Sequence, residues 1–399
     1  MDKMPLDKGA TLIIDRFRSA GYEANVVGGA VRNHILGIPL SDIDIAASAL
    51  PTETVSLFSD HRVIETGIKH GTVTILADGS SYEVTTYRTD GDYLDNRHPE
   101  SVSFTRSLSE DLARRDFTVN AMAYNPYDGI TDLFGGVEDI NARLIRAVGD
   151  PETRFREDAL RILRALRFAS VLGFDIEGNT ATAIRKTAPL LDNVSRERVY
   201  VEWVKLVGGD GGYDIVSAYP DVITVAIPQL RGITLPDKQR FLTQPAAVRT
   251  LALFFASCTD PVSSFDAAMT KLHTDTKTRK SGIAALEIVE NYNLSLQNGV
   301  HNAIYRHGID ATRLAIGLAY TVGKLDCAEY TAAMSALETA PITTLSDLAV
   351  GGGDMIALGI KGKEIGLMLD RLALAVINGV CENERTVLTN YAKENMNAE

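Results

Sequence analysis

The sequence is short of the features that mark secreted, membrane-spanning and zinc-binding proteins. Its 399 residues include three scattered cysteines, Cys258, Cys327 and Cys381, which form no Cys-x-x-Cys spacing. Such cysteines favour reduced thiols in the cytosol over a disulfide framework or a zinc site. The N-terminus has no apolar signal core, and no run of eighteen apolar residues occurs. We therefore expect a soluble, cytoplasmic protein without a membrane partner.

An excess of positive charge is also lacking. The chain has 40 Lys and Arg against 52 Asp and Glu, a formal net charge of −12. This balance argues against a protein coated in positive potential, but it permits a local basic groove, because a nucleic acid responds to how charge is distributed. With 45% hydrophobic residues, the chain is too long for one ordinary core, and we expect about two to four structural units.

The first third of the chain differs from the rest in its predicted secondary structure. A helical pattern over 6–20 is followed by further helical patterns that alternate with short β-type runs. These runs lie at 25–27, 42–46, 72–76, 82–87 and 101–104. After the turn at 149–151, strand patterns nearly vanish, and helical segments continue to the C-terminus with breaks at 208–212 and 351–353. The sequence thus predicts an α+β domain on a mixed sheet, followed by an all-helical region.

Two aspartates spaced two apart, Asp42 and Asp44, follow a glycine pair that ends an apolar run. In a strand their side chains would share one face and present two carboxylates to one point, a pattern that holds Mg²⁺. Gly28 and Gly29 open a short helix whose unpaired N–H groups suit a phosphate, and Arg32 follows in that helix. An isolated Asp-x-Asp is more often a turn or a cap. In this setting the stretch predicts a nucleoside triphosphate site for two-metal phosphoryl or nucleotidyl transfer.

Two segments between 80 and 125 add charged candidates. Glu83, in a predicted strand, is either a third acidic group near the metals or an ordinary exposed residue. Arg114, Arg115 and Asp116 precede an expected Asn-Ala-Met-Ala helix at 120–123. Because arginines near a buried helix need partners, we expect Asp116 to pair with one of them and to leave the other for a ligand phosphate. A purely structural Arg–Asp pair is the alternative.

An arginine-rich helix is predicted over 154–168. Its apolar residues share one face, and Asp158, Arg161, Arg164 and Arg167 recur every third residue on the other side. Most such faces are merely solvated. Here Asp158 can accept and Arg161 can donate, so the pair could recognise the Watson–Crick edge of a base. Arg164 and Arg167 would then be free to neutralise a triphosphate.

The second half of the chain offers two weaker candidates. One is a basic cluster of Lys271, Lys277, Arg279 and Lys280, and the other is the glycine- and lysine-rich stretch 359–366. For both, a solvated helix end is the preferred interpretation over a phosphate site.

Taken in order, these motifs resemble those of the class II tRNA nucleotidyltransferases, the CCA-adding enzymes, which share a superfamily with bacterial poly(A) polymerases. The resemblance rests on residues 28–32 with Asp42 and Asp44, on 114–122 and on 157–161. Residues 150–151 and 195–203 look like the family's connector and its last neck motif. The match covers about the first half of the chain, and the second half offers only the stretch 359–366.

The resemblance implies an architecture and a set of roles. The fold would be a polymerase-β-like head (1–145), a helical neck (146–205), a helical body (206–345) and a helical tail (346–399). Asp42 and Asp44 would be the catalytic Mg²⁺ ligands. The nucleotide-binding residues would be Gly28, Gly29, Arg32, Arg115, Asp158, Arg161, Arg164 and Arg167, with Asp158 and Arg161 selecting C and then A.

The implied activity is addition of C, C and A to the 3′ end of tRNA, with CTP and ATP as substrates and the acceptor arm held by the body and tail. A poly(A) polymerase and an enzyme that adds only CC or only A are the nearest alternatives. A catalytically silent RNA-binding protein is an alternative of another class, and a small-molecule nucleotidyltransferase would have little use for the helical second half. The sequence does not predict the oligomeric state.

The sequence departs from the family's pattern in three places. Asn33 stands where relatives usually have an aspartate after the motif arginine, which removes a charge. We expect this change to tune activity rather than abolish it. No His-Asp pair occurs in the C-terminal half, so the phosphohydrolase domain of some relatives is absent. The basic insert associated with bacterial poly(A) polymerases is also not evident.

Overall fold

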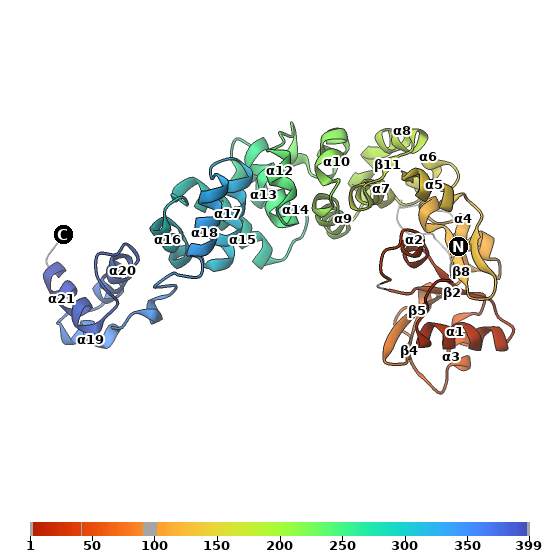
Figure 1. The fold of residues 1–399 in the computed structure, drawn as a ribbon, viewed down its shortest axis with the longest axis horizontal. Helices are drawn as coiled ribbons and strands as arrows, with labels where there is room; N and C mark the ends of the chain where they lie inside the picture. Colours follow the sequence, from red (N-terminus) through yellow and green to blue (C-terminus); the bar gives the residue numbers. More distant parts are fainter. Residues whose placement is uncertain (1–2, 41, 91–101, 397–399) are drawn as a thin grey trace. The chain divides into compact units, whose positions relative to one another are not determined.

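The structure is a computed structural model that describes residues 3–40, 42–90 and 102–396. The chain divides into two compact units, Met1–Ala226 and Ile227–Glu399 (Figure 1). The finer division into head, neck, body and tail stays a prediction. Ser101, the first residue of the predicted strand 101–104, lies outside the described residues, as does Ser41, which precedes the predicted strand 42–46.

A mixed sheet forms the base of the first unit. In the described residues it has seven strands in the order β3-β4-β5-β2-β1-β8-β9, with β2 and β5 parallel and the other neighbours antiparallel. The strands are β1 (Ala24–Val27), β2 (Ile45–Ala47), β3 (Arg62–Ile64), β4 (Thr72–Ala77), β5 (Ser80–Thr86), β8 (Met122–Asn125) and β9 (Gly129–Asp132). Buried Val73 and Ile75 of β4, and Tyr82 and Val84 of β5, alternate with more exposed residues, as expected where one face of a sheet packs on a core. The predicted α+β head with a mixed sheet is confirmed.

Short helices and a two-stranded ribbon complete this part of the first unit. A buried cluster of Val27, Ala46, Tyr87, Leu112 and Ala123 joins strands and helix. The helices are α1 (Lys8–Ser19), α2 (Gly29–Ile35), α3 (Pro51–Leu57), η1 (Ile68–His70), α4 (Leu108–Ala113), η2 (Thr118–Asn120) and α5 (Gly136–Ala142). The ribbon pairs β6 (Arg88–Asp90) with β7 (Val102–Phe104).

Two predictions of local structure near the motifs are wrong. β2 begins at Ile45, so Asp42 and Asp44 precede the strand, and the argument that a strand aligns them does not apply. The expected helix at 120–123 is instead the end of the 3₁₀ turn η2 and the start of β8. All four residues of β8 are buried, and so short an apolar run does not distinguish a strand from a helix by its periodicity.

The rest of the first unit is mainly helical and begins where predicted. Asp150 caps α6 by accepting a hydrogen bond from the Thr153 N–H at 2.8 Å. The helices are α6 (Pro151–Glu157), α7 (Leu160–Leu172), α8 (Gly178–Thr187), η3 (Ala188–Asn193), α9 (Arg196–Gly208), α10 (Gly212–Ala218) and α11 (Pro220–Ala226).

Two expectations for this region are corrected. The single helix expected over 154–168 is broken at Asp158, which has an extended backbone (φ −134°, ψ 103°) between α6 and α7. The region is also not wholly helical, because β10 (Leu144–Ile145) pairs in parallel with β11 (Asp175–Ile176).

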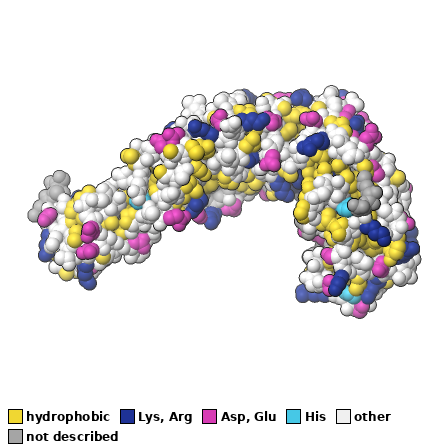
Figure 2. All heavy atoms as spheres, viewed as in Figure 1, with side chains coloured by type: hydrophobic (Ala, Val, Ile, Leu, Met, Phe, Trp, Pro, Cys, Tyr) yellow, Lys and Arg dark blue, Asp and Glu magenta, His cyan; other side chains and the backbone are white. Residues whose placement is uncertain are grey.

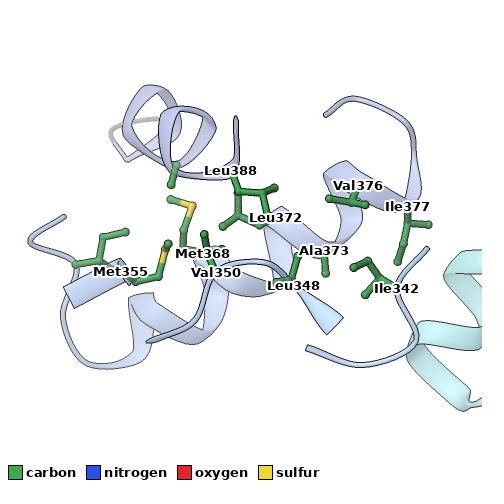
Figure 3. Close-up of a cluster of buried hydrophobic side chains, with 12 residues drawn as sticks. Ile342, Leu348, Val350, Met355, Met368, Leu372, Ala373, Val376, Ile377 and Leu388 are labelled. Atoms are coloured by element: carbon green, nitrogen blue, oxygen red, sulfur yellow. The ribbon is translucent and has the colours of Figure 1, made fainter. Parts of the chain in front are cut away.

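The second unit is helical throughout its described residues. Its elements are η4 (Pro228–Leu230), α12 (Lys238–Leu242), α13 (Ala246–Ser257), α14 (Pro261–Lys271), α15 (Thr276–Asn291), α16 (Gln297–His307), α17 (Ile309–Thr321), α18 (Cys327–Ala336), η5 (Leu345–Asp347), α19 (Gly352–Ala357), α20 (Lys363–Ile377) and α21 (Arg385–Asn395). Near the C-terminus, Met355, Met368, Leu372 and Leu388 belong to one apolar core that joins α19, α20 and α21 (Figure 3).

The surface agrees with the acidic composition. On the face drawn in Figure 2, Lys and Arg side chains are interspersed with Asp and Glu in both units rather than collected in one basic coat. Among the described residues, none of the helices is long and apolar enough to cross a bilayer. The cytoplasmic location stays a prediction.

Candidate active site

An open pocket of about 360 Å³ in the first unit gathers many of the predicted site residues. Its lining consists of Gly28, Gly29, Arg32, Asp44, Arg114, Arg115, Asp116, Asn120, Arg164 and Phe168. Asp42, Asp158, Arg161 and Arg167 are not part of this lining. The pocket therefore joins the glycine turn, one of the two aspartates and several arginines from segments that are far apart in the chain.

The glycine turn lies between β1 and α2. Gly28 has φ +69°, a left-handed conformation that glycine adopts without strain. A Cβ at Gly28 would also lie 3.2 Å from Arg115 Nη1, so the turn lets the guanidinium approach the backbone closely. Because α2 has only seven residues, we attribute most of the positive potential in the pocket to the arginines rather than to the helix terminus.

Asp44 lies beside the turn and within electrostatic range of Asp42 and Glu83. The Asp44 carbonyl accepts the Val27 N–H at 3.0 Å, which places Asp44 next to the end of β1. Ile45 pairs with Val84 in parallel strands, so the residues before them, Asp44 and Glu83, are neighbours across the sheet. Desolvation, followed by the charges of Glu83 and Asp42, raises the pKa of Asp44. Glu83 is itself exposed, and both of its interpretations stay open.

The adjacent arginines share a carboxylate other than the one predicted. Asp111, with no exposed surface, accepts hydrogen bonds from Arg114 Nη2 (2.7 Å) and Arg115 Nη2 (3.0 Å). Burial opposes ionisation of Asp111, but the two guanidinium groups lower its pKa overall. The expectation that Asp116 would pair with one of these arginines is therefore wrong.

Asp116 instead joins the sheet domain to helix α7. Its Oδ2 accepts hydrogen bonds from Arg164 Nε (2.8 Å) and Nη2 (2.5 Å), and Asp116 is only 8% exposed. Burial opposes ionisation of Asp116, but Arg164 lowers its pKa overall. Arg167 likewise pairs with Glu202 of α9, with 2.7 Å between Nε and Oε2. The prediction that Arg164 and Arg167 would be free to neutralise a triphosphate is therefore wrong for the structure described, in which both have carboxylate partners.

Asp158 and Arg161 also have separate protein partners. Asp158 Oδ2 accepts a hydrogen bond from Arg198 Nη2 of α9 at 2.9 Å. Arg161 pairs with Glu157 at 2.6 Å, and its Nη2 donates to the Arg114 carbonyl at 3.0 Å. The second contact ties Arg161 to the segment that lines the pocket.

Comparison with known proteins identifies the family to which this chain belongs. Family models described as "Poly A polymerase head domain", "Probable RNA and SrmB- binding site of polymerase A" and "tRNA nucleotidyltransferase domain 2 putative" match residues 24–146, 173–217 and 249–392. A CCA-adding enzyme of Limosilactobacillus fermentum is 39% identical over 395 residues, 97% of this chain and 96% of its own length. This chain belongs to the CCA-adding enzyme family.

Two further members of the family show which parts of the chain the similarity covers. The CCA-adding enzyme of Geobacillus stearothermophilus is 54% identical over 197 residues, 49% of this chain and 48% of its own length. The crystal structure of the Bacillus stearothermophilus CCA-adding enzyme in complex with CTP matches with a TM-score of 0.81 and 32% identity, covering 98% of this chain and 97% of that one. The chain is accordingly a nucleotidyltransferase with the predicted fold class.

The structure of this CCA-adding family member adds residues that the sequence interpretation missed. Asn120 lines the pocket, accepting a hydrogen bond from Arg32 Nη1 and donating one to Asp116 Oδ1. The Phe168 ring has three guanidinium groups around it, those of Arg32, Arg164 and Arg167, at 5.3, 5.5 and 4.0 Å from its centroid. The spacing of Asp111, three and four residues before its partners, could have predicted these ion pairs from the sequence. No comparable spacing indicated Phe168.

Of the weaker candidates in the second half, the stretch 359–366 contributes Gly359, Ile360, Lys361 and Glu364 to an open pocket of about 1280 Å³, whereas the basic cluster forms ordinary ion pairs. Arg279 pairs with Asp266, and Lys277 lies 3.5 Å from Asp310. These contacts agree with the preferred interpretation of the basic cluster as an ordinary charged helix end. In the stretch 359–366, Gly362 (φ +60°) directly precedes α20, which is the geometry of a helix start.

Proposed function

We propose that this chain adds C, C and A to the 3′ end of tRNA, using CTP and ATP and releasing pyrophosphate. The observation that carries the proposal is one pocket in which Asp44, without an ion pair to any described residue, lies among Arg32, Arg115 and Arg164. The match over nearly the whole chain to relatives named CCA-adding enzymes supports the same activity, as does the CTP complex of a solved relative.

No group of three or more His, Cys, Asp or Glu side chains in the described part of the chain is arranged to hold a metal ion, so the proposed cation site uses the aspartate pair together with oxygen atoms of the bound nucleotide. Burial and two neighbouring carboxylates raise the pKa of Asp44 despite the opposing charge of Arg115, and a net rise indicates negative charge that is incompletely compensated. Carboxylate oxygens are the ligands that Mg²⁺ prefers. Asp42 and Asp44 are the proposed ligands, with Glu83 beside them. Bound Mg²⁺ would supply charge neutralisation at the reacting phosphate and a lower pKa for the attacking hydroxyl.

The arginines provide the binding energy for the nucleotide. Arg32, Arg115 and Arg164 line the pocket, and with Arg167 they would hold the triphosphate through charge-assisted hydrogen bonds. The tRNA 3′-hydroxyl would attack the α-phosphate, and the bond to the pyrophosphate leaving group would break. Asp158 and Arg161 would recognise the base edge by accepting and donating hydrogen bonds.

The predicted division of the chain is part of the proposal. Residues 1–145 would carry the chemistry, 146–205 the base selection, and 206–345 with 346–399 the grip on the tRNA acceptor arm.

An incorporation assay separates this proposal from its alternatives. A tRNA lacking its CCA end is incubated with CTP alone, ATP alone and both, and the products are sized. CCA addition gives two added nucleotides with CTP alone and three with both. A ladder of adenylates would indicate a poly(A) polymerase. A product that stops at CC with both nucleotides, or that needs a preformed CC end, would indicate a partial enzyme, and no product would favour a silent RNA-binding protein.

Asp42→Ala tests the assignment of the metal ligands. We expect about a thousandfold loss of incorporation or more, with tRNA binding measured by gel shift largely intact. Glu65→Ala is the matched control, because Glu65 is an exposed head carboxylate outside the pocket, and it should retain full activity. Undiminished turnover in Asp42→Ala would overturn the two-metal assignment.

A further inference from the structure

Arg32 differs from the other arginines of the pocket in what its guanidinium contacts. Arg114 and Arg115 bind Asp111, and Arg164 binds Asp116. Arg32 binds two neutral amides: Nε and Nη2 donate to Asn33 Oδ1 at 3.2 and 3.0 Å, and Nη1 donates to Asn120 Oδ1 at 2.5 Å. Within residues 3–40, 42–90 and 102–396, no carboxylate forms an ion pair with Arg32.

The surroundings make this charge without an ion pair costly in the ligand-free protein. Burial, followed by the charge of Arg167, lowers the pKa of Arg32 to about 10, although the charge of Asp116 opposes the change. The group still carries its proton at neutral pH. An anion that enters the pocket would therefore relieve a repulsion as well as form new hydrogen bonds.

The amides orient the guanidinium without consuming all of its donors. An arginine has five N–H groups, and the contacts to Asn33 and Asn120 use three of them. Because Asn33 Oδ1 accepts from both Nε and Nη2, it fixes one edge of the planar group. Two N–H groups and the full positive charge are left for a ligand.

We propose that Asn33 is a positioning residue for the nucleotide's phosphates, because its neutral oxygen orients Arg32 and leaves it without an ion pair. The inference rests on the proposed function in taking the anion to be a nucleoside triphosphate. If Asn33 had a purely structural role, only its hydrogen bonds would matter. A carboxylate at this position would then leave the KM values for CTP and ATP unchanged.

The test compares Asn33→Asp with Asn33→Ala in the full chain. Asn33→Asp retains an acceptor for both N–H groups and adds a negative charge. We expect an unchanged or higher melting temperature, KM values for CTP and ATP raised about threefold to tenfold, and little change in kcat. Asn33→Ala keeps the charge of Arg32 but loses its orientation, so we expect a lower melting temperature and a smaller rise in KM.

Binding of inorganic pyrophosphate, measured by calorimetry, separates this inference from the proposed function. The parent should bind pyrophosphate more tightly than Asn33→Asp, with the gap narrowing at high salt. Asn179→Asp adds the same charge at an exposed residue outside the pocket, and it should behave as the parent does. If Asn33→Asp matches the parent in both pyrophosphate affinity and KM, the inference is overturned. Failure of the parent to extend tRNA would count against the proposed function alone.

Discussion

The sheet side of the pocket and its helical side differ in how their charged groups are paired. On the sheet side, the trio Asp42, Asp44 and Glu83 has no arginine salt bridge among the described residues, and Arg32 is held by neutral amides. On the helical side, Arg164 binds Asp116 and Arg167 binds Glu202. Apart from Arg114 and Arg115, which share Asp111 on the sheet side, the sheet side carries charge without an ion pair, whereas the helical side pairs its charges within the protein.

This difference indicates a division of labour. A paired and buried arginine has a fixed position, because moving it would leave its carboxylate uncompensated. An unpaired charge raises the energy of the empty site and gives that energy back when a ligand of opposite sign arrives. We infer that the helical side mainly sets geometry and that the sheet side mainly binds the metal and the phosphates.

Asp116→Asn should have the largest effect on stability, because it removes a carboxylate from the side of the pocket where the charges are paired. The change leaves Arg164 half-buried without its carboxylate, and we expect the free energy of unfolding at pH 7 to fall by about 2 kcal/mol. The measurement is chemical denaturation of the full chain. Asp60→Asn, which breaks the exposed pair with Arg16, is the control and should cost much less.

The same variant has a defined pH dependence. The folded-state pKa of Asp116 is lowered, so its contribution is present above the unfolded-state value near 4 and is lost as the pH falls through the folded-state value. The stability gap between parent and Asp116→Asn should therefore be constant from pH 8 to about pH 5 and shrink below pH 4. A gap that widens on acidification would contradict the role of the ionised carboxylate.

Local spacing predicted the residues of the site better than their partners. Gly28, Arg32 and Asp44 stand within twenty residues of one another, and all three line the pocket. The contact between Arg164 and Asp116 spans 48 residues, and no local pattern reveals it. The sequence could therefore indicate that Arg164 belongs to the site, but not that a carboxylate already holds it.

Local periodicity also failed where tertiary packing competes with it. The arginine pattern over 154–168 continues without interruption, yet the chain is extended at Asp158, whose carboxylate binds Arg198 of α9. β8 lies between β1 and β9 and was expected to be helical. In both places, partners distant in sequence decide the local conformation.

Phe168→Leu tests whether the ring helps three like charges to share one space. Leucine keeps an apolar side chain but removes the π-face near Arg32, Arg164 and Arg167, so we expect KM for CTP and ATP to rise about twofold to fivefold. Phe174→Leu is a matched control, because the Phe174 ring lies 5.3 Å from the Arg143 guanidinium and does not line the pocket. It should lose similar stability with an unchanged KM. Equal KM effects in the two variants would mean that the ring acts only by packing.

Asp44→Asn should produce the smallest change and the one with the opposite sign. In metal-free buffer the substitution removes one of three repelling carboxylates, so we expect the free energy of unfolding to rise by roughly 0.5 kcal/mol after solvent screening. Mg²⁺ should raise the melting temperature of the parent, since a ligand stabilises the state that binds it, but should do so much less for the variant. Asp128→Asn removes a charge from an exposed turn outside the pocket and should respond to Mg²⁺ as the parent does. Destabilisation of Asp44→Asn without metal would show that Asp44 is already compensated within the protein, and the contrast between the two sides of the pocket would then fail at its acidic residues.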